Sequence, residues 1–531
     1  MRPAPTPSSG RVACGLRRAC VAVLIASQAL LPVASPVHAQ VLPGMGDGGE
    51  MTASAERRLG DQIARELYRD PDFIDDPVLV DYVQGIWTRL LAAARTRGDL
   101  TPELDERFAW TLLLGRDRSI NAFALPGGYL GLHLGLIAAT DSSDELATVL
   151  GHELSHVTQR HIARMMSRQS RQLPILLAAM VLGMVAAAKS RSGDAGQAVV
   201  MGTQAMAMQN QLDFSRDMER EADRVGFGVM TQAGFAPEGA ASMFEKLQYA
   251  SRLNDNGSYP YLRSHPLNSE RISDMQARFQ FREPAAGAPS TPGRPVAAVT
   301  MQHALIAARA RVLTRPGVDV LRQWIVAAAP SSGDFSRQSR ARQAGMLYAA
   351  ALSALELREN ASARAFAERL EPVARDDSAA ARLARLLSAE IELAAGAAAK
   401  AAALLGTPAP RERPELILAA QAAVGLRRPE PMIAPLRDRV AAHPRDALAW
   451  HTLAALYDAQ GDTVRAVRSD AEANVAIFDY AAARDRLKAA QMLASQGGNM
   501  TIDHYEASIL DTRARAVEAL WREQEEEKLP K

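Results

Sequence analysis

The sequence predicts a mainly α-helical protein that has one small β-sheet and ends in a series of helix pairs. Three observations support this class. Apolar residues recur at helical spacing over most of the chain, strand signals are confined to residues 108–136, and the part beyond residue 300 is alanine-rich with almost no strand signal. A chain of 531 residues is too long for one ordinary core, so we expect two or three domains.

The composition excludes several classes of protein. Hydrophobic residues make up 48% of the chain and charged residues 23%, which is typical of a globular protein rather than a disordered one. The 61 basic and 60 acidic residues leave a net charge of +1. Because phosphate contacts need a basic face, this balance argues against a nucleic-acid partner.

Residues 1–39 are typical of a cleaved export signal. Basic residues precede an apolar run at 19–33, and small residues at 37–39 offer a cleavage site. A membrane anchor is the alternative, but the run is too short to span a bilayer. Cys14 and Cys20, the only two cysteines, lie in this segment. The mature chain is therefore expected to hold any metal with histidines and carboxylates.

The next part of the chain predicts the helices and the sheet in order. Apolar spacing of three and four indicates helix over 54–97. Residues 108–114 are typical of a strand. The stretch 120–136 mixes β-formers with several glycines and Pro126, which favours a bent edge strand or a hairpin.

The following helix carries the most informative motif of the chain. Ser142 and Glu145 have the form of a capping box, so the helix is expected to begin there. His152 and His156 lie on one face, away from the apolar stripe, and both can reach a single zinc ion. Glu153, beside the first histidine, is the residue type that takes a proton from water in such sites.

Two segments and a linker follow. Residues 174–188 are strongly apolar and residues 201–208 are rich in methionine. They predict a buried helical hairpin or an adaptable segment that covers the site. A segment that contacts a membrane is the alternative. The proline-rich stretch 283–299 indicates a linker, so we expect one domain at 50–282 and another at 300–531.

Two histidines leave a zinc site incomplete. One large class places its third histidine where this chain has Ile162, which excludes that class, and we interpret His161 as a surface residue. Glu219 and Asp223 are four residues apart on a second predicted helix. They suit a ligand and a carboxylate that orients a ligand imidazole, although an exposed acidic face remains open. Glu221 points elsewhere and is expected to be solvated.

These motifs resemble a known family. His-Glu-x-x-His followed by Glu-x-x-Ala-Asp, with Asn-Ala-Phe-Ala-Leu-Pro-Gly-Gly at 121–128, resembles the gluzincin family that includes the HtpX and CaaX prenyl proteases. The export signal, the tail, and Ser-His-Pro-Leu at 264–267 with Arg271 narrow the resemblance to periplasmic members. It covers roughly residues 50–280, and more loosely the C-terminal half.

The resemblance implies a role for each matching residue. His152, His156 and Glu219 would bind one zinc ion per chain. Glu153 would be the general base. Asp223 would be the supporting acid that is treated in this family as a proton donor.

It also implies a binding edge and a regulatory ligand. The substrate-binding edge strand would consist of Asn121, Ala122, Phe123 and Ala124. His265 would act as a latch that occupies the fourth position on the metal, although a plain loop residue remains the alternative. Arg271 would either stabilise a substrate oxyanion or pin the loop that carries His265.

The tail is predicted to be a tetratricopeptide-like solenoid. Trp450, Leu453, Ala454 and Tyr457, followed by alanines at 466 and 473, have the spacing of one such repeat. Similar helix pairs are expected at 348–370 and 379–405. Alanine-rich pairs bury their apolar faces by stacking, so a solenoid is expected, with an irregular helical domain as the alternative.

The sequence as a whole predicts a zinc-dependent endopeptidase of the periplasm. By resemblance, it would degrade unfolded or misassembled outer-membrane proteins and assist their assembly, with its repeats contacting the assembly machinery and with peripheral membrane contact. One alternative is a chaperone or adaptor whose zinc site is permanently latched. Another is an integral membrane protease, which the single apolar stretch after the signal disfavours.

Overall fold

The computed structural model describes residues 51–168, 216–252, 259–280, 299–406, 412–496 and 504–527. The predicted export signal, the apolar segment 174–188, the methionine-rich segment 201–208 and all but the last residue of the linker at 283–299 lie outside the described residues. Among the helices of the described part, none combines the length and apolar character needed to cross a bilayer.

The helical stretch predicted at 54–97 is two helices, α2 (Ala53–Tyr68) and α3 (Pro77–Arg97). The break has a local cause, because Asp76 caps α3 by accepting a hydrogen bond from the Leu79 amide and proline occupies the first turn. The segment between the helices bonds to the sheet through the amide of Ile74 and the carbonyl of Leu114. A short helix, α4 (Pro102–Arg107), follows.

The sheet has three strands, β1 (Thr111–Gly115), β2 (Ala122–Leu125) and β3 (Tyr129–His133), in the order β1-β3-β2. β3 is central, parallel to β1 and antiparallel to β2. The predicted strand at 108–114 is shorter and begins later. The predicted hairpin at 120–136 is present, with a turn at Pro126–Gly128 that needs the positive φ of Gly127. Its last residues belong instead to α5 (Leu134–Ala139).

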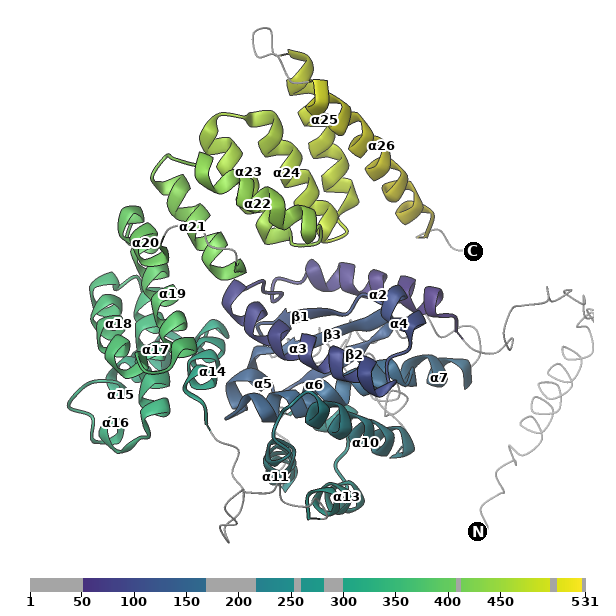
Figure 1. The fold of residues 1–531 in the computed structure, drawn as a ribbon, viewed down its shortest axis with the longest axis vertical. Helices are drawn as coiled ribbons and strands as arrows, with labels where there is room; N and C mark the ends of the chain where they lie inside the picture. The colour runs from purple at the N-terminus through teal and green to yellow at the C-terminus, as the bar shows by residue number, and fades with distance from the viewer. Residues whose placement is uncertain are drawn as a thin grey trace, which may run out of the picture. The chain divides into compact units, whose positions relative to one another are not determined.

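Two helices under the sheet carry the predicted motifs. The first, α6 (Ser143–Thr158), begins where the capping box predicts, because the Ser142 hydroxyl accepts a hydrogen bond from the Glu145 amide. The second, α10 (Arg216–Gln232), packs along α6, and α6 also contacts β2 (Figure 1). Three further helices complete this part of the chain: α7 (His161–Arg168), α11 (Glu238–Arg252) and α13 (Ser269–Gln280).

α6 and α10 approach so closely that only glycine fits at their crossing. A Cβ atom on Gly226 would lie 2.9 Å from the backbone of Gly151 and from the His152 amide nitrogen. Because cores are packed at close to crystal density, no side chain could be inserted there without separating the helices. This crossing sets the distance between the histidines of α6 and the carboxylates of α10.

The C-terminal part consists of helices arranged largely in antiparallel pairs (Figure 1). Their bounds are α14 (Met301–Leu313), α15 (Val318–Ala327), α16 (Gly333–Arg337), α17 (Arg340–Glu356), α18 (Asn360–Ala374), α19 (Ser378–Ala394), α20 (Ala398–Leu405), α21 (Arg413–Gly425), α22 (Glu430–Ala442), α23 (Ala447–Gln460), α24 (Thr463–Ala476), α25 (Tyr480–Gln496) and α26 (His504–Glu527). The helix pairs predicted at 348–370 and 379–405 are α17–α18 and α19–α20.

The predicted repeat falls on α23 and α24. Leu453 and Tyr457 of α23 and Ala473 of α24 are buried. Helices plus a small sheet, followed by helix pairs, confirm the predicted fold class. Assignment of the pairs to tetratricopeptide repeats stays a prediction.

Buried ion pairs join the C-terminal helices to the region around the start of α3. Arg309 of α14 donates two hydrogen bonds to Asp76, at 2.8 and 2.6 Å, and two more to Glu390 of α19. One nitrogen of Arg413 of α21, Nη2, lies 2.8 and 2.7 Å from the two carboxylate oxygens of the partly buried Asp75. One buried apolar cluster also extends from Ala53 to Ala422. The two predicted domains therefore share a core.

Replacing Gly226 with alanine should separate α6 from α10. We expect Gly226→Ala to lower the free energy of unfolding by about 1–3 kcal/mol, because the added methyl group meets backbone atoms that cannot move aside. Gly85→Ala is the matched control, since a Cβ at this exposed position in α3 meets nothing within 4 Å. It should raise stability by about 0.5–1 kcal/mol. Equal effects in urea denaturation would contradict the close crossing.

His303 of α14 should make stability depend on pH. Its buried ring lies between the Tyr82 hydroxyl, at 2.7 Å, and the Thr140 carbonyl, at 3.0 Å, and burial lowers its pKa to about 4. The unfolded chain binds this proton more readily, so its contribution to stability is present above about pH 6.5 and is lost as pH falls toward 4.

We therefore expect the stability difference between wild type and His303→Gln to shrink between pH 7 and pH 4.5. His443→Gln, which removes an exposed histidine, controls for loss of a histidine elsewhere. A difference that is constant over this range would be inconsistent with a buried neutral ring.

Candidate metal centre

Two imidazoles of α6 converge on one point. His152 and His156 are buried, and their Nε2 atoms lie 3.0 Å apart. Each ring uses its other nitrogen elsewhere: His152 Nδ1 lies 2.9 Å from Asp223, and His156 Nδ1 lies 2.8 Å from His161 Nδ1. The spacing of four residues predicts this shared face, and the structure has it.

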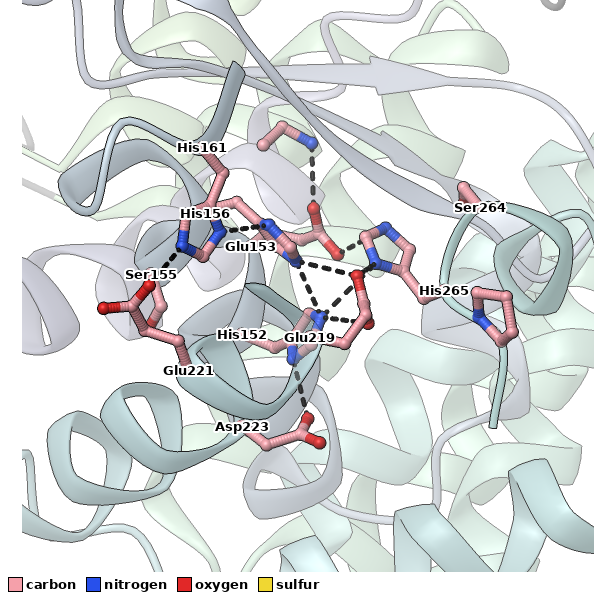
Figure 2. A network of polar contacts seen from close by, with 12 residues as sticks. His152, Glu153, Ser155, His156, His161, Glu219, Glu221, Asp223, Ser264 and His265 are labelled. Atoms are coloured by element: carbon pink, nitrogen blue, oxygen red, sulfur yellow. Dashed lines mark hydrogen bonds and ion pairs between the residues drawn. The ribbon is translucent and has the colours of Figure 1, made fainter. Parts of the chain in front are cut away.

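A carboxylate from α10 and a third imidazole complete the cluster. Glu219 Oε2 lies 3.4 Å from His152 Nε2, and Glu219 Oε1 lies 3.4 Å from His156 Nε2. His265 follows the short helix α12 (Tyr261–Ser264) and places its Nδ1 atom 3.0 Å from Glu219 Oε1. One ligand atom from each of these four buried residues lies within 4.8 Å of the others (Figure 2).

This arrangement fits a tetrahedral zinc ion. Bonds of about 2.0–2.1 Å to nitrogen or oxygen imply ligand atoms roughly 3.3–3.4 Å apart. The observed separations between the donor atoms of His152, His156, Glu219 and His265 include 3.0, 3.3 and 3.4 Å. Both Nδ1 atoms of α6 contact other residues, so the two Nε2 atoms are the ones that face Glu219. These two nitrogens and the carboxylate would hold a metal ion between them.

The electrostatics of the cluster point the same way. Burial favours the neutral form of His152, but hydrogen bonds to Asp223 and Glu219 outweigh it and raise its pKa to about 10. Burial and the neighbouring charge of His152 hold the pKa of His156 well below its usual value. Burial alone would raise the pKa of Glu219, but the charge on His265 and the hydrogen bond from His152 hold it well below its usual value. The site thus keeps Glu219 ionised and attracts positive charge.

Asp223 lies behind His152 rather than beside the cluster's open side. Arg271 of α13 holds its carboxylate with two hydrogen bonds of 2.7 and 2.8 Å. Despite burial, the Arg271 guanidinium and the His152 ring lower the pKa of Asp223. An ionised carboxylate on Nδ1 orients the imidazole, as the spacing predicts. The proton-donor role that the resemblance implies for Asp223 stays a prediction.

Arg271 is likewise positioned for one of its two predicted roles. It is buried, and its third nitrogen donates to the Pro266 carbonyl at 2.9 Å and lies 2.9 Å from Glu219 Oε2. With these partners the guanidinium pins the loop of His265 and supports Asp223. Its oxyanion role stays a prediction.

Glu153 connects the cluster to the sheet. Its Oε2 atom accepts a hydrogen bond of 2.8 Å from the Ala124 amide, and its Oε1 atom lies 3.4 Å from His265 Nε2. Burial raises the pKa of Glu153, which suits a group that must accept and release a proton. Oε1 of Glu153 therefore faces the cluster while Oε2 is held by the strand.

β2 is an edge strand, and its free side faces Glu153. The His133 amide donates to the Asn121 carbonyl, so residues 121 and 123 bond to β3. The alternation of an antiparallel pair then turns the amides of Ala122 and Ala124 outward. Phe123 packs its ring over Gly131 and holds the hairpin together. The predicted edge segment therefore lies beside the metal cluster.

Two residues that we interpreted as solvated are part of the site. His161 is buried, with Nδ1 on His156 and Nε2 at 3.0 Å from Glu221 Oε2. Glu221 is partly buried and also accepts a 2.9 Å bond from Arg164. The interpretation was wrong because α6 ends at Thr158 and α7 begins with a new direction, so helical spacing no longer applies. The only signal was a third histidine close to the motif.

Comparison with known families agrees with this geometry. Residues 100–279 match peptidase family M48. This part of the chain is an M48 peptidase domain. The family match confirms the predicted resemblance to metallopeptidases and the predicted class of enzyme, a metalloendopeptidase.

Known proteins are similar over the same region. The beta-barrel assembly-enhancing protease of Escherichia coli is 34% identical over 277 residues, which is 51% of this chain and 54% of that protein. Its namesake in Yersinia pestis is 35% identical over 260 residues, 49% of this chain and 50% of that protein. The mitochondrial metalloendopeptidase OMA1 of Arabidopsis thaliana is 30% identical over 180 residues, 34% and 33% of the two chains. The alignments span about half the length of the beta-barrel assembly-enhancing proteases.

Removing the charge behind His152 should weaken metal binding. We expect Asp223→Asn to lower zinc affinity by about 10- to 100-fold, because the ligand imidazole loses the carboxylate that orients it. Competition with a chromophoric chelator measures this affinity. Asp217→Asn is the matched control, since Asp217 is an exposed carboxylate on the same helix. Unchanged affinity in Asp223→Asn would count against the orienting role.

Proposed function

We propose that this protein is a zinc-dependent endopeptidase of the periplasm of a Gram-negative bacterium. The observation that carries the proposal is the convergence of His152, His156 and Glu219 beside Glu153 and the free edge of β2. A cluster of buried acceptors, a buried carboxylate and an exposed strand edge are the parts that peptide hydrolysis needs.

Each residue has a defined task in this reaction. His152, His156 and Glu219 hold the zinc ion, which when bound acidifies water and polarises a carbonyl group. A substrate segment adds to β2 as a further strand and pairs with the outward amide of Ala122, while the Ala124 amide holds Glu153. Asp223 and Arg271 keep His152 oriented.

Glu153 moves the proton. It accepts a proton from the attacking water and delivers it to the leaving amine. Its Oε1 atom faces the cluster while its Oε2 atom is held by the Ala124 amide, so one oxygen is positioned and the other is available. The same amide lies on the substrate edge, so substrate pairing and the base are placed by one strand.

His265 is the regulatory element of this proposal. Its Nδ1 faces the cluster and its Nε2 faces Glu153, so the ring stands where water must enter. Four protein ligands close a zinc site, whereas catalysis needs an open position. Activity therefore requires the loop of His265 to move away, and the Arg271 bond to Pro266 holds it in place.

The substrates we propose are unfolded or misassembled β-barrel proteins of the outer membrane. The names of the Escherichia coli and Yersinia pestis relatives support this class, and the export signal predicted at 1–39 supports the periplasm. A strand edge binds a peptide through main-chain hydrogen bonds, so it suits substrates whose β-strands are unpaired. The C-terminal helix pairs would dock such clients or the assembly machinery.

A second candidate rests on His265. If its loop never opens, the protein is an adaptor or chaperone that works through its helices. Cleavage assays with loop variants separate the two candidates, because an adaptor has no activity to release.

We expect Glu153→Gln to bind zinc like wild type and to lower kcat by about 10²- to 10⁴-fold, because only the proton acceptor is lost. His265→Ala should cleave faster than wild type. Purified mature chain with zinc and unfolded casein provides the assay, and His443→Ala controls for loss of an exposed histidine. If none of the variants cleaves casein or an unfolded outer-membrane protein, the adaptor is favoured.

A further inference from the structure

His156 is backed by a second imidazole instead of a carboxylate. His161, the first residue of α7, is fully buried and reaches His156 with Nδ1 at 2.8 Å. Its Nε2 atom lies 3.0 Å from Glu221 Oε2. The result is a continuous row of His156, His161 and Glu221, which lies to the left of the cluster in Figure 2, with His265 to the right.

Metal binding by His156 fixes which nitrogen donates and which accepts in each hydrogen bond of this row. A histidine that binds metal through Nε2 carries its proton on Nδ1. His156 Nδ1 must therefore donate, and His161 Nδ1 must accept. Since a neutral imidazole has one donor and one acceptor, His161 then donates from Nε2, and the Glu221 carboxylate accepts that bond.

The opposite direction would destroy the ligand. If His161 donated from Nδ1, His156 would hold its proton on Nε2, which is the atom directed at the cluster. Glu221 prevents this by requiring a donor at His161 Nε2. A carboxylate two residues from the ligand Glu219 thus selects the tautomer of a histidine on another helix.

The chain is built to hold this pair in place. Arg160 adopts a left-handed backbone with φ of 52° between α6 and α7, which turns His161 back toward His156. Arg160 is fixed by Glu56, at 3.2 Å, and Arg164 fixes Glu221 at 2.9 Å. A non-glycine residue in this region costs about 1–3 kcal/mol, so the surrounding contacts hold it there.

We propose that His161 and Glu221 are positioning residues that set the metal-binding tautomer of His156. The inference rests on the proposed metallopeptidase function and extends it. Neither residue belongs to the group of four that supplies ligand atoms, and His161 acts through its contact with His156. Asp223 and Arg271 do the same for His152, so each ligand histidine has its own carboxylate from α10.

The test measures zinc affinity of the full mature chain by competition with a chromophoric chelator. His161→Phe keeps a ring but removes the acceptor, and we expect about 10- to 100-fold weaker binding. His161→Asn can still accept through its side-chain oxygen and should fall between Phe and wild type. Glu221→Gln, at a partly exposed position that should not impair folding, should also weaken binding.

Two controls separate positioning from folding and from charge. Glu270→Gln removes one nearby negative charge outside the row, on α13, and should bind zinc like wild type. The visible absorption of the cobalt-substituted protein should shift in His161→Phe and Glu221→Gln but not in Glu270→Gln. Combined His161→Phe and Glu221→Gln changes should be less than additive, because they break one row.

The outcomes distinguish the inference from the proposed function. Wild-type zinc affinity and cobalt spectra in both His161→Phe and Glu221→Gln would overturn the inference while leaving the metallopeptidase intact. A lower thermal stability of the metal-free variants with unchanged affinity would also overturn it, because it indicates structure alone. Failure of wild type to bind zinc would instead refute the proposed function, and the inference with it.

Discussion

The close crossing of α6 and α10 at Gly151 and Gly226 is the constraint on which the site depends. A helix normally keeps its neighbour about 8–10 Å away, with side chains between the axes. Two facing glycines remove that layer, so side chains one or two turns from the crossing reach each other directly. The glutamate side chain of Glu219 is then long enough to reach across, and its oxygens lie 3.4 Å from both imidazoles of α6.

Once the helices are this close, α10 supplies every carboxylate that the histidines need. Glu219 faces the cluster, Asp223 holds His152, and Glu221 holds His161 behind His156. Burial of Glu219 and Asp223, and partial burial of Glu221, is costly unless each carboxylate is paired. Arg271 pairs with Asp223, and Arg164 pairs with Glu221. Glu219 lies 2.9 Å from Arg271 as well and is the carboxylate that also faces both imidazoles of α6.

The sheet and the loop after α12 bring the reaction's other parts to the same place. The Ala124 amide joins the free edge of β2 to Glu153, and His265 stands between that carboxylate and the cluster. Opening the loop would therefore expose base, strand edge and metal position together. The C-terminal helices contribute through Arg309 and Arg413, whose aspartate partners lie in the segment that bonds to β1.

Sequence predicted the parts of the site that follow from local rules. Helical spacing places His152 and His156 on one face, the capping box begins α6 at the right residue, and four-residue spacing places Glu219 and Asp223 together. It failed where the chain changes direction. His161 lies beyond the end of α6, so its position depends on the left-handed turn at Arg160, which no spacing rule predicts. The role of Arg271 and the crossing at Gly226 depend on tertiary packing between distant segments, which the sequence alone does not reveal.

The central claim is that three side chains from two helices hold one metal ion. Anomalous diffraction at the zinc absorption edge, from crystals grown with zinc, tests it most directly. The account predicts a single peak per chain between His152 Nε2, His156 Nε2 and a Glu219 carboxylate oxygen. A zinc-saturated crystal with no peak at that point, or with a peak that Glu219 does not contact, would contradict it.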